Sequence, residues 1–212
     1  MNRWPAWFIT IVVIASVCRL FPLFHVVPLK TAAAEKVAAT FDSTQFAEIF
    51  WTNQLLASFD KAVPTEKLLS AIQSDMTAAK KKFSRSVGLS DNYFYFLRGE
   101  EKIISVSDDE ISLAVTENST NAEIVLETGL VFGDAVRDGS GLLNASDYAN
   151  SQDFNDISAA LNHIVETRVL PKLREQAKVG EKISFVGCAE VDDESTDLKP
   201  LKVIPIQTEV ER

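Results

Sequence analysis

Residues 128–180 read TGLVFGDAVRDGSGLLNASDYANSQDFNDISAALNHIVETRVLPKLREQAKVG, and this stretch decides the fold. The apolar, β-favouring residues 130–136 predict a strand, and residues 137–141 (RDGSG) are of the types that turns require. Apolar side chains then recur at three- and four-residue spacing, which predicts a helix with one apolar face: Phe154, Ile157, Leu161, Ile164 and Val165. Ser151 or Asp153 is the expected N-cap. The stretch therefore predicts a strand, a polar elbow and a long helix.

Pro171 falls late in this helix. Because proline lacks an amide hydrogen and clashes with the preceding turn, we expect it either to kink the helix or to begin a short second helix that runs to Gly180. Asn155 and Asn162 are seven residues apart, on one side of the helix. Asparagine is a poor helix former, so we expect their amides to bond to neighbouring loops.

Segments with a period of two predict strands on both sides of the helix. Four precede it and two follow it, at 93–97, 102–106, 111–116, 123–127, 182–191 and 201–210. This is the order of an OB-like β-barrel with one long inserted helix. Residues 41–88 have the apolar period of helices, with a break at 63–65. We therefore predict an α+β protein in three parts: a signal or anchor segment (1–30), a small helical subdomain (31–90) and an OB-like domain (91–212) against which the subdomain packs.

The N-terminal segment is apolar and predicts export. It fits an uncleaved membrane anchor of about twenty residues, or a signal peptide followed by a lipidated Cys18, or cleavage after the alanines at 32–34. A lipobox has a small residue directly before its cysteine, whereas this chain has Val17, which favours the anchor over lipidation. All three alternatives place the soluble part on the periplasmic side of the inner (cytoplasmic) membrane.

The charge argues against a nucleic-acid partner. The formal net charge is -9, and three of the 21 basic residues but none of the 30 acidic residues lie within residues 1–30. The soluble part is therefore even more acidic than the whole chain. An OB-like barrel that binds single strands needs a basic groove along the phosphate backbone, which this composition does not supply.

Few residues of the types used in catalysis or metal binding are present. The chain has two histidines, His25 and His163, and two cysteines, Cys18 and Cys188. The sequence contains too few histidines for a histidine-rich metal site, and it has no CxxC pair, phosphate-binding glycine loop or nucleophile elbow. Cys188 is expected to pack as a small apolar residue in a strand. We therefore expect no cofactor, no metal ion and no enzymatic activity.

Polar residues with binding potential gather at the elbow, namely Asp134, Arg137, Asp138 and, at the start of the helix, Asn155. The planar guanidinium of arginine suits carboxylates, phosphates or sugar hydroxyls. Two interpretations follow. Arg137 either pairs with a nearby acid and locks the elbow onto the helix, or these four residues form a binding site. A hydrolase that uses the Arg137/Asp138 region is the alternative function.

Five segments together carry a family resemblance: FGDAVRDGSGL (132–142), NSQDFNDISAALN (150–162), VLPKLREQAKVG (169–180), FVGCAEV (185–191) and DLKPLKVIPI (197–206). They resemble the domain of unknown function 2291 family, predicted periplasmic lipoproteins. The resemblance implies a helical subdomain followed by an OB-like domain, and Cys18 as the acylated residue. It also implies an accessory or binding role beside the components of a sugar ABC uptake system, rather than catalysis.

Overall fold

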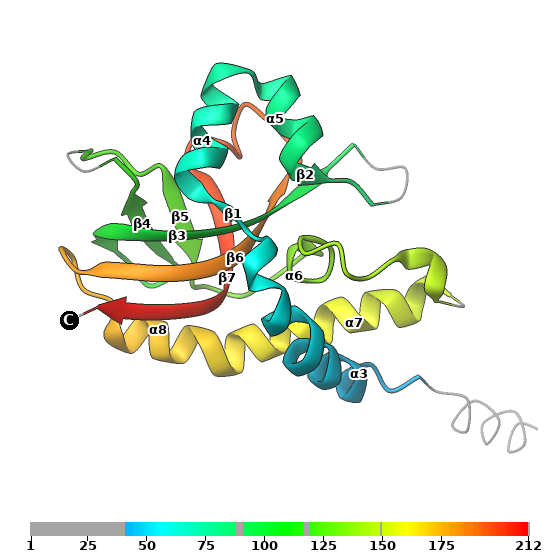
Figure 1. Cartoon of the computed structure of the whole chain (residues 1–212). Coiled ribbons are helices and arrows are strands. Elements are labelled where there is room, and N and C mark those ends of the chain that lie inside the picture. The colour runs from blue at the N-terminus through cyan, green and yellow to red at the C-terminus, as the bar shows by residue number, and fades with distance from the viewer. Residues whose placement is uncertain (1–40, 88–90, 117–118, 149, 212) are drawn as a thin grey trace, which may run out of the picture. The chain divides into compact units, whose positions relative to one another are not determined.

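The computed structural model describes residues 41–87, 91–116, 119–148 and 150–211 (Figure 1). The strands are β1 (Val63–Pro64), β2 (Ser84–Arg85), β3 (Tyr93–Val106), β4 (Glu110–Ala114), β5 (Ile124–Glu127), β6 (Lys182–Val191) and β7 (Leu201–Glu211). The longer helices are α3 (Ser43–Phe50), α4 (Thr65–Ser74), α5 (Met76–Phe83), α7 (Ser151–Ile164) and α8 (Leu170–Gln176). Shorter helical turns are η1 (Trp51–Leu55), η2 (Leu56–Lys61), α6 (Ala135–Asp138), η3 (Ala145–Asp147) and η4 (Val165–Val169).

The sheet closes on itself through β3. This strand pairs with β4 and also with β6, and the order β3-β4-β5-β7-β6 returns to β3. All pairings in this ring are antiparallel except β5 with β7. Between β5 and β6 the chain runs through α6, η3, α7, η4 and α8. The ring and the position of these helices are those of the five-stranded OB fold.

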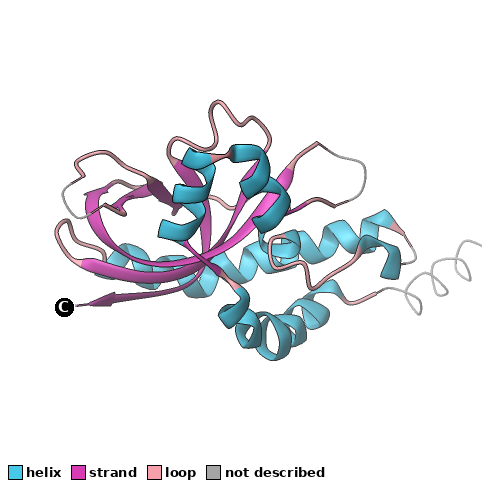
Figure 2. Ribbon diagram, turned by 45° about the horizontal axis from the view of Figure 1, so that its top comes forward, coloured by secondary structure: helices cyan, strands magenta, loops and turns pink. Residues whose placement is uncertain are grey.

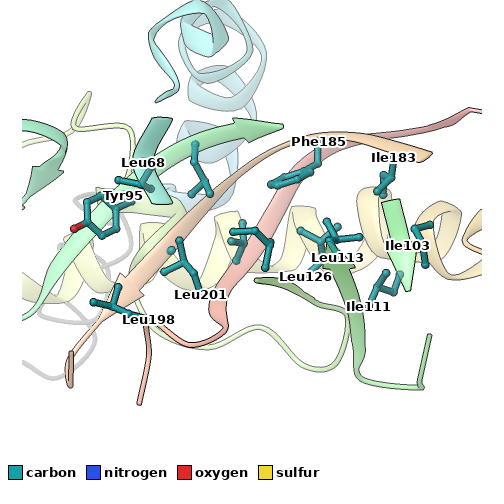
Figure 3. Packing of buried hydrophobic residues seen from close by; sticks show 14 of the residues in the cluster. Leu68, Tyr95, Ile103, Ile111, Leu113, Leu126, Ile183, Phe185, Leu198 and Leu201 are labelled. Atoms are coloured by element: carbon teal, nitrogen blue, oxygen red, sulfur yellow. The ribbon is translucent and has the colours of Figure 1, made fainter. Parts of the chain in front are cut away.

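Helices lie on both sides of the strands, as Figures 1 and 2 show. Leu68 of α4 joins the buried apolar cluster inside the ring from one side, and Leu173 of α8 joins it from the other. Figure 3 shows Leu68 beside Tyr95 at one end of this cluster, with Ile103, Ile111 and Ile183 at the other end. The helices α3 to α5 belong to the same compact unit as the sheet, which begins at Asp42.

The strands predicted separately at 93–97 and 102–106 form one strand, because the turn expected between them, at 98–100, lies inside β3. The strand pairs with β6 without interruption from Tyr93 to Lys102. Gly99 is required for packing and makes no turn, since a Cβ there would collide with the side chains of Thr65 and Glu101. A glycine that signals a turn locally can thus mark a close approach within a strand.

The predicted strand at 130–136 is also wrong. The last strand before the helix, β5, ends at Glu127, and residues 130–132 form a loop without strand pairing. Gly133 has a φ of 76°, and the chain then turns into the short helix α6. Apolar, β-favouring residues did not produce a strand here, because side chains of other elements bond to the backbone of this segment in place of a neighbouring strand.

The long helix has the predicted buried face but a different start. Phe154, Ile157, Leu161, Ile164 and Val165 are all buried. The N-cap is Asn150, whose side chain accepts a hydrogen bond from the Asp153 amide, in place of the expected Ser151 or Asp153. Pro171 stands in the first turn of α8, as one of the two alternatives predicted. α7 packs on α3 and α6, and η4 and α8 pack on β7, so the second half of the helical run lies against the sheet.

The N-terminal segment 1–30, with Cys18, lies outside the described residues, and so does Gly88, where the last helix of the 31–90 subdomain was expected to end. α5 ends at Phe83. Within the described part of the chain, no helix has the length and apolar character needed to cross a bilayer.

Candidate functional site

The structure brings together the four residues predicted at the elbow. Arg137 Nε donates to Asp138 Oδ1, and its Nη2 donates to Asp138 Oδ2, each over 2.8 Å. Nη2 also lies 3.1 Å from Asp134 Oδ2. Nη1 donates to the carbonyl of Phe154 over 3.2 Å and reaches Asn155 Oδ1 at 3.5 Å. The guanidinium lies over the Phe154 ring, 3.7 Å from its centroid.

The guanidinium thus makes four hydrogen bonds and one further ion-pair contact, with Asp134. The side chains of Arg137 and Asp138 are 5% and 2% exposed, so neither presents a free surface to a ligand. Phe154 and Asn155 belong to the first turns of α7, whereas Arg137 belongs to α6. The network therefore locks α6 onto the start of α7, which is the first of the two interpretations of the elbow.

Cys188 lies directly beneath the elbow. A Cβ added at Gly139 would collide with the Cys188 side chain, and Cys188 itself is fully buried. Burial, together with the nearby charge of Asp138, raises the pKa of the Cys188 thiol. Because the thiolate is the nucleophilic form, this cysteine is unreactive and packs as a small apolar residue, as predicted.

The largest cavity among those described lies beside α4 and has a volume of about 1200 Å³. We name it the α4 cavity. Its walls come from α4, the start of α5, the residues that directly follow β4 and directly precede β5, and the segment between β6 and β7. The lining residues are Glu66, Leu69, Ser70, Ile72, Gln73, Met76, Val115, Thr116, Ala122, Glu123, Glu194, Ser195, Leu198 and Lys199.

Three carboxylates line the α4 cavity. Glu123 accepts hydrogen bonds from the amides of Val115 and Thr116, each over 2.9 Å, and so fixes the cavity wall at β4. Glu194 forms an ion pair with Lys80, with 3.0 Å between Glu194 Oε1 and Lys80 Nζ. The hydrogen bond from Lys80 lowers the pKa of Glu194. Glu66, in the first turn of α4, is exposed. The rim of the cavity is therefore rich in hydrogen-bond acceptors.

Glu101 is a buried acid next to this cavity. Pairing of β3 with β4 begins at Lys102 and Ala114, which places Glu101 opposite Val115 of the cavity wall. Glu101 is 5% exposed, and Thr65 at the start of α4 donates a hydrogen bond to its carboxylate. Burial raises the pKa of Glu101 to about 7. The Thr65 bond opposes this rise, and the charges of Glu66, Glu123 and Glu100 add to it. Sequence reasoning did not identify this residue, because a lone glutamate in a strand carries no motif.

A second, shallower cavity of about 460 Å³ lies over three neighbouring strands. Arg98 and Glu100 of β3, Ser184 and Val186 of β6, and Gln207 and Glu209 of β7 occupy matching positions in the strand registers. None of the elbow residues lines this cavity or the α4 cavity. Within the described residues, no three histidine, cysteine or acidic side chains are close enough together to hold a metal ion.

Comparison with solved structures establishes the fold. An OB-fold protein from Thermotoga maritima MSB8 matches with a TM-score of 0.72 and 24% sequence identity, over 81% of this chain and 99% of that chain. At this identity the similarity shows the fold alone, and it confirms the OB-like, α+β part of the prediction. A comparison with curated proteins finds no significant match.

The particular family follows from the sequence. The family model DUF2291, predicted periplasmic lipoprotein, matches residues 8–209. The chain belongs to this family, as the resemblance carried by the five segments of its second half predicted. Membership agrees with an exported protein that is held at a membrane.

Proposed function

We propose that the protein is a non-enzymatic binding or accessory protein, tethered by its N-terminus to the periplasmic side of the inner membrane, which holds a small ligand in the α4 cavity. Family membership supports the compartment and the tether. The observation that supports binding is the α4 cavity itself, because it is large enough for a small organic ligand and has a mixed lining.

The lining indicates the kind of ligand. Leu69, Ile72 and Met76 form an apolar wall along one side of α4 and the start of α5. Glu66, Gln73 and Thr116 supply oxygen atoms that accept hydrogen bonds, and Lys199 is the one cation among the lining residues. Such a site suits a ligand with an apolar body that carries hydroxyl or amino groups. A sugar also carries hydroxyl groups, and the C–H groups on the faces of its ring can lie against an apolar wall, which agrees with the proposed role beside a sugar ABC uptake system.

The alternative of an envelope hydrolase gains no support from the elbow. A catalytic acid or base must reach a substrate, whereas Arg137 and Asp138 are buried and bonded to each other. Cys188 does not supply a nucleophile there either, because burial raises the pKa of its thiol.

Ligand-induced stabilisation of the purified soluble part tests the proposal. Monosaccharides, disaccharides and linear diamines are added one at a time, and the melting temperature is recorded for the parent chain, Ser70→Trp and Ser184→Trp. Ser70 lines the α4 cavity, and Ser184 lines the shallower one. We expect at least one compound to raise the melting temperature of the parent and of Ser184→Trp but not of Ser70→Trp, because the indole fills the cavity. Equal stabilisation of all three chains would show that the compound binds elsewhere.

A further inference from the structure

Two large apolar side chains project from the segment between β5 and α6. Leu130 and Phe132 are each 75% exposed, while Val131 between them is buried. We name residues 128–134 the Leu130 loop. A single exposed apolar residue needs no explanation, but a leucine and a phenylalanine that are both largely exposed, one residue apart, form a small apolar surface of the kind that contacts partners.

The middle and end of the Leu130 loop are fixed by side chains of the long helix. Glu166 Oε1 accepts from the Val131 amide over 2.9 Å. Asn162 Nδ2 donates to the Gly133 carbonyl over 3.0 Å, and Ser158 Oγ donates to Asp134 Oδ1 over 2.7 Å. Both Asn162 and Ser158 are more than nine-tenths buried. These buried polar side chains therefore form hydrogen bonds with the loop in place of water.

The start of the loop is fixed as well. The amides of Thr128 and Gly129 both donate to the carbonyl of Asp109, over 2.7 and 3.1 Å. Arg174 of α8 donates to the carbonyl of Thr128 and, over 3.4 Å, to that of Gly129. Taken together, the hydrogen bonds at its start, middle and end join the loop to α7, η4, α8 and the turn between β3 and β4. The positions of Leu130 and Phe132 are thus set before any partner arrives, which lowers the entropy lost on binding.

The charges beside the loop are mainly acidic. A Cβ at Gly129 would lie 3.0 Å from Asp109 Oδ1, and one at Gly133 would lie 2.9 Å from Glu190 Oε2. The Asp134 side chain is 42% exposed. Among the described residues, two cations contact the loop: Arg174, whose Nη2 is bonded to loop carbonyls, and the buried Arg137, which lies 3.1 Å from Asp134 Oδ2 and is paired with Asp138 as well. An anionic lipid surface or a second copy of this acidic face would be repelled, so the charge favours a basic partner.

We propose that Leu130 and Phe132 dock into an apolar pocket, rimmed by lysine or arginine, on a protein partner in the periplasm. The aromatic ring and the leucine are the anchors, since such residues supply most of the binding energy at interfaces. Asp109, Asp134 and Glu190 contact the basic rim and speed association. This surface is separate from the α4 cavity, so the proposal stands without a ligand there.

Site-specific crosslinking identifies the partner. The photoreactive amino acid p-benzoylphenylalanine replaces Phe132 in the full-length chain in cells, and the control carries it at Val179, which is 65% exposed in another turn. We expect an adduct with one protein at position 132 and not at position 179. An adduct with lipid, an adduct with a second copy, or no adduct at position 132 would overturn the proposal.

Binding of the crosslinked protein, once purified, supplies the decisive measurement. We expect the double variant Leu130→Ser, Phe132→Ser to bind at least tenfold more weakly than the parent, with an unchanged melting temperature because both side chains are exposed. Val179→Ser should bind like the parent. The parent's affinity should fall as salt is added, since the acidic and basic rims are screened. Affinity that is insensitive to the two serines, or that rises with salt, would refute the proposed docking mode.

Discussion

Arg137 and Asp138 are neighbours in the sequence, and their side chains form a two-pronged ion pair inside the protein, with both N–O distances at 2.8 Å. The pair is also bonded to the backbone of α7 through Phe154. A buried ion pair gains little over apolar residues of the same volume, but removal of one partner leaves the other charge buried without compensation. The pair therefore fixes the position of α6 more than it adds stability.

The first prediction concerns this pair. Arg137→Met should lower the free energy of unfolding by about 3–5 kcal/mol, because Asp138 loses its partner inside the protein. Arg137→Lys should have a smaller effect in the same direction, since an amine keeps the charge but loses the fork of donors. Urea unfolding of each variant measures both effects.

A surface ion pair provides the control. Arg168 and Glu48 are 53% and 39% exposed, and Arg168→Met should cost no more than about 1 kcal/mol. If Arg137→Lys is as stable as the parent but fails to bind a partner or a sugar per folded molecule, the elbow is a binding site and the structural interpretation is wrong.

The sequence predicted the elements whose pattern is set by burial. The apolar face of α7 and the strands β6 and β7 lie where periodicity placed them, because a one-sided core requires that spacing. Prediction from the sequence failed where contacts between residues far apart in the chain override the local preference of a segment. Gly99 stays in β3 because β6 pairs with this strand from Tyr93 to Lys102. The segment after β5 leaves the sheet because Arg174 bonds the Thr128 and Gly129 carbonyls and Glu166 bonds the Val131 amide.

Of the two candidate sites, the elbow could be predicted from the sequence and the α4 cavity could not. The elbow residues are within a short segment, so the sequence showed that they lie close together, although it left open whether they lock the fold or bind a ligand. The α4 cavity is formed by residues from Glu66 to Lys199, and a wall of this kind depends on how helix α4 packs on the strands. No local pattern could have predicted it.

The second prediction tests the packing of the long helix. Leu161 is fully buried, so Leu161→Ala should lower the free energy of unfolding by about 2–5 kcal/mol through lost burial and the cavity left behind. Ile49 is 52% exposed, and Ile49→Ala serves as the control, with a much smaller expected loss. A negligible loss for Leu161→Ala in denaturant melts would contradict the assignment of this side chain to the core.

The third prediction concerns the tether. The full-length chain should fractionate with membranes, and protease added to spheroplasts should digest everything after about residue 35, since the positive end of the first apolar run stays inside. Cys18→Ala separates the alternatives for residues 1–30. Loss of membrane association would support lipidation of Cys18, and retention would support an uncleaved anchor. Protection of the soluble part from protease would contradict a periplasmic location.

The fourth prediction is a dependence of stability on pH that arises from Glu101. Its pKa is raised to about 7 in the folded protein by burial and by neighbouring acids, from 4.5 for the ordinary group. The folded state therefore holds the proton more tightly than the unfolded state. The stabilisation is complete below pH 4.5 and is lost as the pH rises through 7, by at most about 3 kcal/mol.

Glu101→Gln isolates this effect. Glutamine keeps an acceptor for the Thr65 hydroxyl but has no charge, so the variant should lose the part of the fall in stability that Glu101 causes and be more stable than the parent at pH 8. Burial also raises the pKa of Glu127 and of Glu190, so a smaller fall remains in the variant. Glu100→Gln is the matched control, because Glu100 is the exposed neighbour on the same strand. Urea melts at several pH values give the free energies. Because Thr65 begins α4, hydrogen exchange of the α4 amides should also slow in Glu101→Gln at pH 8. If the free energy of unfolding depends on pH in the same way in the parent and in Glu101→Gln, the pKa of Glu101 is not raised in the folded protein and the prediction is wrong.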